Sequence, residues 1–99
     1  MARLNKSARG KHRWVGFLVD QEFTREDLEG LLSENLELNS WRLFDKLATN
    51  GKTIAIVKVP IADYQAALSE LNNLDGISTL TSSGKIRLVR ERIGELELE

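Results

Sequence analysis

Hydrophobic and polar positions recur along the chain with two different periods, and each period predicts a type of element. The stretch from Arg13 to about Asp20 is rich in aromatic and β-branched residues, which is typical of a half-buried strand. Thr24, with Asp27 three residues later, is a good N-cap for a helix that follows. That helix has one apolar stripe at helical spacing, made of Leu28, Leu31, Leu32 and Leu36.

A hairpin and a second helix come next in the pattern. Residues 41–47 and 53–59 are rich in apolar and β-branched residues, and Asn50-Gly51 between them is a strong hairpin signal. An apolar stripe then predicts a helix from about Ala62 to Leu74, which Asp75-Gly76 ends. Residues 77–80 and 85–89 fit a strand or hairpin, whereas residues 86–93 also fit a short terminal helix, and periodicity leaves both open.

This order of elements, β-α-β-β-α-β, predicts an α+β domain with a ferredoxin-like sandwich. In that arrangement both helices cover one face of an antiparallel sheet, and the other face of the sheet is open. The 99 residues suit one domain with one modest core. We assign residues 1–12 to a flexible basic arm, residues 13–93 to the folded domain and residues 94–99 to an acidic tail.

The composition argues against several classes of function. The chain has no cysteine, so it forms no disulfide and no thiolate metal site, which fits a reducing, cytoplasmic compartment. His12 is the single histidine and lies in the predicted arm, where a catalytic triad or a zinc site lacks its other groups. No glycine motif for phosphate binding and no membrane-spanning apolar run occurs. We therefore expect no catalytic residue, no cofactor, no metal and no membrane partner.

The charges are unevenly distributed, although the net charge is only −1. The region of residues 20–37 is acidic, and so is the C-terminus. Two segments are basic and are candidates for contacts with RNA phosphates, which are independent of sequence and sensitive to salt. The first segment contributes Arg3, Lys6, Arg9, Lys11 and Arg13, and the second contributes Lys85, Arg87, Arg90 and Arg92.

Aromatic residues of the first strand are candidates for stacking on unpaired bases. Trp14 and Phe17 differ in parity along the strand, so they face opposite sides of a regular sheet and one of them belongs to the core. We interpret Trp41 as a residue of the core or of an edge. The acidic first helix argues against RNA on its side of the domain and suggests a basic protein partner or solvent.

Three short motifs, in the same order, resemble a known family. Lys11-His12-Arg13-Trp14 runs directly into a hydrophobic strand, and Asp63-Tyr64-Gln65-Ala66-Ala67-Leu68 places an aromatic residue before Ala-Ala-Leu. Near the C-terminus stands Ser82-Ser83-Gly84-Lys85-Ile86-Arg87. Together they resemble the Pop5/Rpp14 family, the protein subunits of archaeal and eukaryotic ribonuclease P. This chain departs from that pattern in being shorter and in having Lys85 where threonine is common.

The resemblance implies a ferredoxin-like fold and an accessory role in processing the 5′ end of precursor tRNA. In that enzyme the RNA performs catalysis, and the subunit helps to fold and position it. The positions that match the motifs are Lys11, Arg13, Trp14, Ser83, Gly84, Lys85 and Arg87. The resemblance also implies a protein partner subunit, for which the acidic helix is a plausible contact.

We therefore expect an RNA-binding subunit of a ribonucleoprotein, whose two basic segments lie on one side of the fold. The alternative is a protein-interaction module or small regulator that pairs through its sheet face or edge, as a homo-oligomer or with another chain. A sensor of small molecules is a third hypothesis, and it requires a pocket with converging polar groups.

Overall fold

The computed structural model describes residues 12–37 and 40–95, and over these residues strands and helices alternate. The strands are β1 (His12–Val19), β2 (Arg42–Thr49), β3 (Lys52–Pro60) and β4 (Ile77–Ser83). The α-helices are α2 (Arg25–Asn35), α3 (Tyr64–Asn72) and α4 (Ile86–Gly94), and a 3-10 turn, η1 (Ile61–Asp63), precedes α3. The predicted α+β class with an antiparallel sheet is confirmed.

The spatial order of the strands is β2-β3-β1-β4, which differs from their order along the chain. β1 is an inner strand that pairs with both β3 and β4, and β3 also pairs with β2. The sheet edges are therefore β2 and β4. Within the described residues, no helix is long and apolar enough to cross a membrane.

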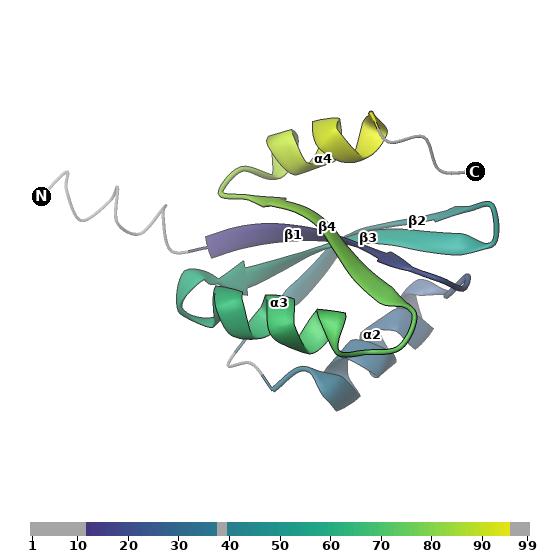
Figure 1. The fold of residues 1–99 in the computed structure, drawn as a ribbon, viewed down its shortest axis with the longest axis horizontal. Helices are drawn as coiled ribbons and strands as arrows, with labels where there is room; N and C mark the ends of the chain where they lie inside the picture. The colour runs from purple at the N-terminus through teal and green to yellow at the C-terminus, as the bar shows by residue number, and fades with distance from the viewer. Residues whose placement is uncertain (1–11, 38–39, 96–99) are drawn as a thin grey trace, which may run out of the picture.

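The helices form layers on both sides of the sheet (Figure 1). α2 and α3 lie on one side, as expected, and α4 lies on the other side. The expectation of an open second face is therefore wrong, because α4 covers the part of that face formed by β4 and β1. The open question about the C-terminal segment is also answered: residues 86–94 form a helix, and the strand alternative for residues 85–89 is wrong.

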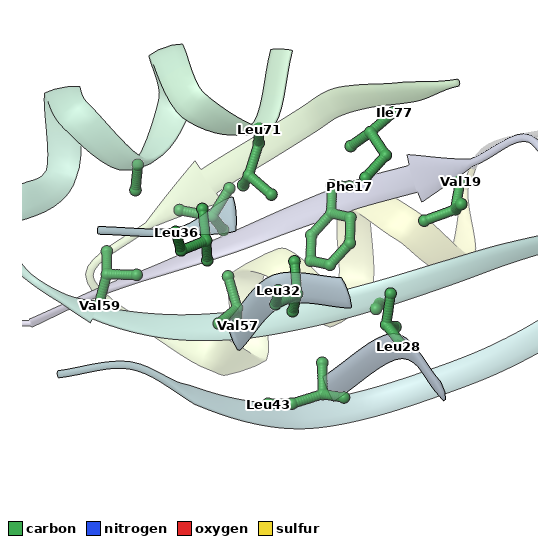
Figure 2. Close-up of a cluster of buried hydrophobic side chains, with 13 residues drawn as sticks. Phe17, Val19, Leu28, Leu32, Leu36, Leu43, Val57, Val59, Leu71 and Ile77 are labelled. Atoms are coloured by element: carbon green, nitrogen blue, oxygen red, sulfur yellow. The ribbon is translucent and has the colours of Figure 1, made fainter. Parts of the chain in front are cut away.

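The core lies between the sheet and the helices α2 and α3 (Figure 2). β1 contributes Val15, Phe17 and Val19 to it, and Phe17 is fully buried. The leucine stripe predicted for the first helix supplies Leu28, Leu32 and Leu36. Trp41 is partly buried against this cluster, so its interpretation as a packing residue is confirmed.

The hairpin turn and the helix cap that the sequence predicts are present in the structure. Asn50 and Gly51 adopt positive φ angles of 53° and 79°, as a tight hairpin turn between β2 and β3 requires. The backbone N–H of Asp27 donates to Thr24 Oγ1 over 3.1 Å, which confirms Thr24 as the N-cap of α2. The second helix begins at Tyr64 and not at Ala62, because residues 61–63 form the tighter turn η1.

Most of the predicted arm and the end of the predicted tail lie outside the described residues, so the limits of the domain stay a prediction. The predicted arm lies outside the described residues except for His12, which is the first residue of β1. The candidate residues Arg3, Lys6, Arg9 and Lys11 also lie outside them, as does the acidic tail beyond Glu95.

A glycine in β1 allows α4 to approach the sheet. Gly16 is buried, and a Cβ atom built on it would stand 2.8 Å from Ile93 Cδ1 and 3.2 Å from Val89 Cγ1. Real Cβ contacts essentially never fall below 3.0 Å, so a side chain here would push these groups away. The close packing of Ile93 and Val89 on β1 thus uses the space that a side chain at residue 16 would occupy.

We expect Gly16→Val to lower the free energy of unfolding by about 1–3 kcal/mol, the usual cost of overpacking a filled site. Urea denaturation measures the change, and hydrogen exchange should show faster opening of α4 than of β3. Gly30→Ala is the control, because nothing lies within 4 Å of that position. It should stabilise the chain by about 1 kcal/mol through helix propensity. An unchanged urea midpoint for Gly16→Val would contradict the docking of α4 on β1.

Candidate nucleic-acid interface

A row of neighbouring residues crosses the sheet at the end where β1 begins. Arg42 pairs with Lys58, and Lys58 pairs with Trp14 on the next strand. Trp14 in turn pairs with Ser83 of β4. Residues paired across antiparallel strands point to the same side of a sheet, about 5 Å apart. Because Trp14 alternates with the core residue Val15, this row faces away from the core, on the side of α4.

An irregularity in β2 adds a second aromatic ring to this row. The pairing of β2 with β3 shifts between Leu43 and Asp45, which leaves Phe44 as an extra residue. The Phe44 ring meets the Trp14 ring edge-on, with centroids 4.6 Å apart and planes at 85°. This contact holds the indole of Trp14 in one orientation.

Two cations lie over these rings. Lys58 Nζ is 5.5 Å from the centroid of the Trp14 ring, and the guanidinium carbon of Arg42 is 5.6 Å from that of Phe44. Both distances are within the range of cation–π attraction. The row therefore presents positive charge directly on aromatic faces.

Two adjoining hollows open at this place, and we call them together the basic–aromatic hollow. The larger has a volume of about 650 Å³ and is lined by His12, Trp14, Lys58, Gly84 and Lys85. The smaller shares His12 and Lys58 with it and is further lined by Ser40, Trp41, Arg42 and Pro60. The ionisable side chains in both linings are His, Lys or Arg, with no carboxylate among them.

The turn between β4 and α4 forms one wall of this hollow. Ser83 is buried, and its hydroxyl accepts a hydrogen bond from the Lys85 backbone N–H over 3.2 Å. This bond shapes the turn, so Ser83 acts on the backbone while Gly84 and Lys85 stand exposed at the hollow. α4 then begins without a side-chain cap or an acid in its first turn, and Arg87 is exposed there.

The candidate residues predicted near Trp14 lie on two sides of the sheet, because side chains alternate along β1. Trp14, Gly84 and Lys85 line one hollow, with Ser83 beside them. Arg13 points to the other side of the sheet, where its guanidinium lies 5.2 Å from the ring centroid of Tyr64 in α3. Its Nε atom is buried without a hydrogen-bond partner in the described part of the chain. Arg13 therefore does not join Trp14 in the hollow.

The two remaining arginines of α4 are bonded to the protein itself. Arg90 donates from Nε and Nη2 to the two carboxylate oxygens of Asp45, at 2.7 and 3.0 Å. This hydrogen bonding, together with the charge of Asp45, raises the pKa of Arg90 above its ordinary value. Arg92 Nη1 donates to Thr81 Oγ1 and to the Ser82 carbonyl, at 3.1 and 3.0 Å. An RNA phosphate would have to compete with these partners.

The sequence analysis did not single out Arg42 and Lys58, which line the hollow, or Phe44, which packs against Trp14 beside it. Lys58 had a usable signal, because it is a polar position in the otherwise apolar second half of β3, but its pairing with Arg42 depends on the register shift between Leu43 and Asp45. Phe44 had none, because its orientation depends on a shift in register that alternation does not predict.

Known proteins give no further guidance. We find no match for this chain among protein-family models, curated proteins or solved structures. In residues 12–37 and 40–95, no three His, Cys, Asp or Glu side chains are grouped so that they could hold a metal ion. The interpretation of the hollow therefore depends on its own geometry.

We expect Asp45→Ala to loosen α4, because it removes both carboxylate acceptors of Arg90. Hydrogen exchange should become faster in α4 and stay unchanged in β1 and β3. The difference from the wild type should shrink at high salt, because the pair is exposed. Glu29→Ala removes another exposed ion pair, with Arg25 in α2, and serves as the control. Equal exchange of α4 in all three proteins would show that Arg90 does not hold the helix.

Proposed function

We propose that this chain is an RNA-binding accessory subunit of a ribonucleoprotein. The row of Arg42, Lys58 and Trp14 across three strands is the observation that carries this proposal. Cations attract phosphates, and an indole face stacks on any base. A surface that combines both, without a carboxylate in its lining, suits RNA better than it suits a basic or apolar protein.

The N-terminal basic segment supports the same site. Its residues Arg3, Lys6, Arg9 and Lys11 lead covalently to His12, which lines both parts of the hollow. Lys85, from the second basic segment, lines the larger part. Contacts from both segments would therefore add to one footprint on the RNA.

Ribonuclease P is the ribonucleoprotein that we propose. The motif around Trp14 and the motif around Ser83 both resemble that family, and Trp14 and Ser83 are partners in the sheet. Two motifs 69 positions apart thus meet beside one hollow. In such an enzyme the RNA carries the chemistry, and this chain would bind and position it together with a protein partner subunit.

We also propose that the fold is ferredoxin-like. β3 lies between β1 and β2, and β1 lies between β3 and β4. The connections through α2 and α3 therefore interleave, which is the arrangement of a split β-α-β motif. α4 is an addition to that plan, since it follows β4 and covers the opposite face.

The proposal predicts salt-sensitive binding to ribonuclease P RNA and precursor tRNA, and weaker binding to duplex DNA. A variant with Arg42→Ala, Lys58→Ala and Lys85→Ala should bind RNA more weakly. The slope of log affinity against log salt should become shallower by about 1.4–2, since each lost phosphate contact removes roughly 0.7. Fluorescence anisotropy at a series of salt concentrations measures both quantities.

Lys52→Ala is the matched control for Lys58→Ala, because both lysines belong to β3 and Lys52 lies at its opposite end. It should leave the affinity and the salt slope unchanged. Equal losses of RNA affinity in the control and in the triple variant would show that the effect comes from net charge and not from the hollow. Equal weak binding of the wild type to RNA and DNA would contradict an RNA subunit.

A second candidate function is that of a protein-interaction module. An apolar groove separates α4 from β2 and β3, and it is lined by Leu47, Ile54, Ile56, Ile93 and Gly94, with Asp45 and Arg90. Leu47 is 57% exposed there, on an edge strand of the sheet. Exposed apolar side chains beside a sheet edge are typical of pairing with another chain.

This second function predicts self-association that depends on Leu47. Sedimentation equilibrium should show a mass that rises with protein concentration, and Leu47→Glu should keep the chain monomeric. Ile61→Glu is the control, because Ile61 is a large apolar residue, 47% exposed, outside the groove. A wild-type chain that stays monomeric at all concentrations would leave only a heterologous partner for the groove.

A further inference from the structure

The basic–aromatic hollow has the size of a small-ligand site and not of a track for a long strand. Its larger part, of about 650 Å³, is within the range of roughly 300–1,000 Å³ that holds a ligand the size of a nucleotide. Only one indole, that of Trp14, lines this part. A single base therefore fills the indole surface of this larger part, and the second indole, that of Trp41, lines the adjoining part.

The residues that border the hollow also limit how many nucleotides it can hold. On one side the Ser83–Lys85 turn leads into α4, which covers β4 and β1. On the other side, beyond Phe44, the same face carries Asp45 paired with Arg90. Past that ion pair the lining is apolar, with Leu47, Ile54 and Ile56. Among the described residues of these two borders, Arg90 is paired with Asp45 and the groove lining beyond that pair carries no aromatic ring, whereas Arg87 at the start of α4 is exposed.

The state of Trp14 without a ligand shows which two groups the ligand must supply. Phe44 packs against the indole with its ring plane at 85° to it, so the orientation of the indole is set before binding and little side-chain entropy is lost. Lys58 covers the ring with its ammonium group. A ligand that takes the ring face must give Lys58 another anionic or π partner, and a nucleotide brings a phosphate together with a flat base.

We propose that the hollow binds one unpaired nucleotide of the RNA, with its base on Trp14 and its phosphate between Lys58 and Lys85. Arg42, in the adjoining part, contacts the neighbouring phosphate. The inference rests on the proposed function and adds a recognition rule to it. Paired stems are held through their phosphates alone, whereas a bulge or an unpaired end gains the stacking contact.

Two hairpin RNAs that differ by one bulged uridine in the stem test this rule. Fluorescence anisotropy at one salt concentration should show tighter binding of the bulged hairpin, by about 5- to 150-fold, the value of one base–aromatic contact. Trp14→Leu should remove this preference, so that the bulged and the paired hairpin bind with equal affinity. Trp14→Phe keeps a ring and should retain part of the preference, whereas Lys52→Ala should retain all of it.

A measurement on the wild type keeps the test valid if Trp14→Leu fails to fold. In a nuclear magnetic resonance titration, the indole N–H signal of Trp14 should shift with the bulged hairpin and stay in place with the paired one. Equal affinity of the wild type for both hairpins, with no shift of that signal, would overturn the single-nucleotide site and leave RNA binding intact. No binding to either hairpin would overturn the proposed function itself.

Discussion

The alternation of side chains along β1 is the constraint on which the rest of the structure depends. β1 pairs on both sides, so its register fixes β3 and β4 together. The core between the sheet and the helices α2 and α3 contains Val15, Phe17 and Val19 of β1. Because side chains alternate along a strand, Trp14 and Gly16 lie on the opposite face. Shifting β1 by one residue would exchange these sets, placing Trp14 in the core and emptying the site of its aromatic ring. Stability and the candidate site thus depend on the same register.

Gly16 determines how the second face is divided. Because it has no side chain, Val89 and Ile93 reach the sheet and α4 lies over β1 and β4. The helix leaves the basic–aromatic hollow at one end of the face and an apolar groove beside β2 and β3. A sheet open from edge to edge would present a long surface for a strand of RNA. The position of α4 limits it to a short site and separates that site from any protein contact in the groove.

The parts of the structure that depend on local chemistry could be predicted from the sequence. The Asn50-Gly51 turn, the Thr24 cap and the leucines of α2 follow from backbone geometry and periodicity. The separation of Trp14 from Phe17 also follows from parity alone. The position of α4 does not, because it depends on the fit of Ile93 and Val89 over Gly16, which are far apart in the sequence. Arg13 and Trp14 are neighbours in the sequence motif but lie on opposite faces of the sheet, since successive side chains of a strand alternate in direction.

The distribution of charge matters more for this site than the net charge of −1. The acidic side chains of the first helical region belong to α2, on the far side of the sheet from the hollow. Asp45 lies on the same face as the hollow, but Arg90 neutralises it through both carboxylate oxygens. Coulomb interactions at exposed sites fade over about 8 Å at physiological salt, so an anion bound at the hollow would respond mainly to Lys58, Lys85 and Arg42. A chain that is slightly acidic as a whole can therefore present a cationic surface where Trp14 offers its ring.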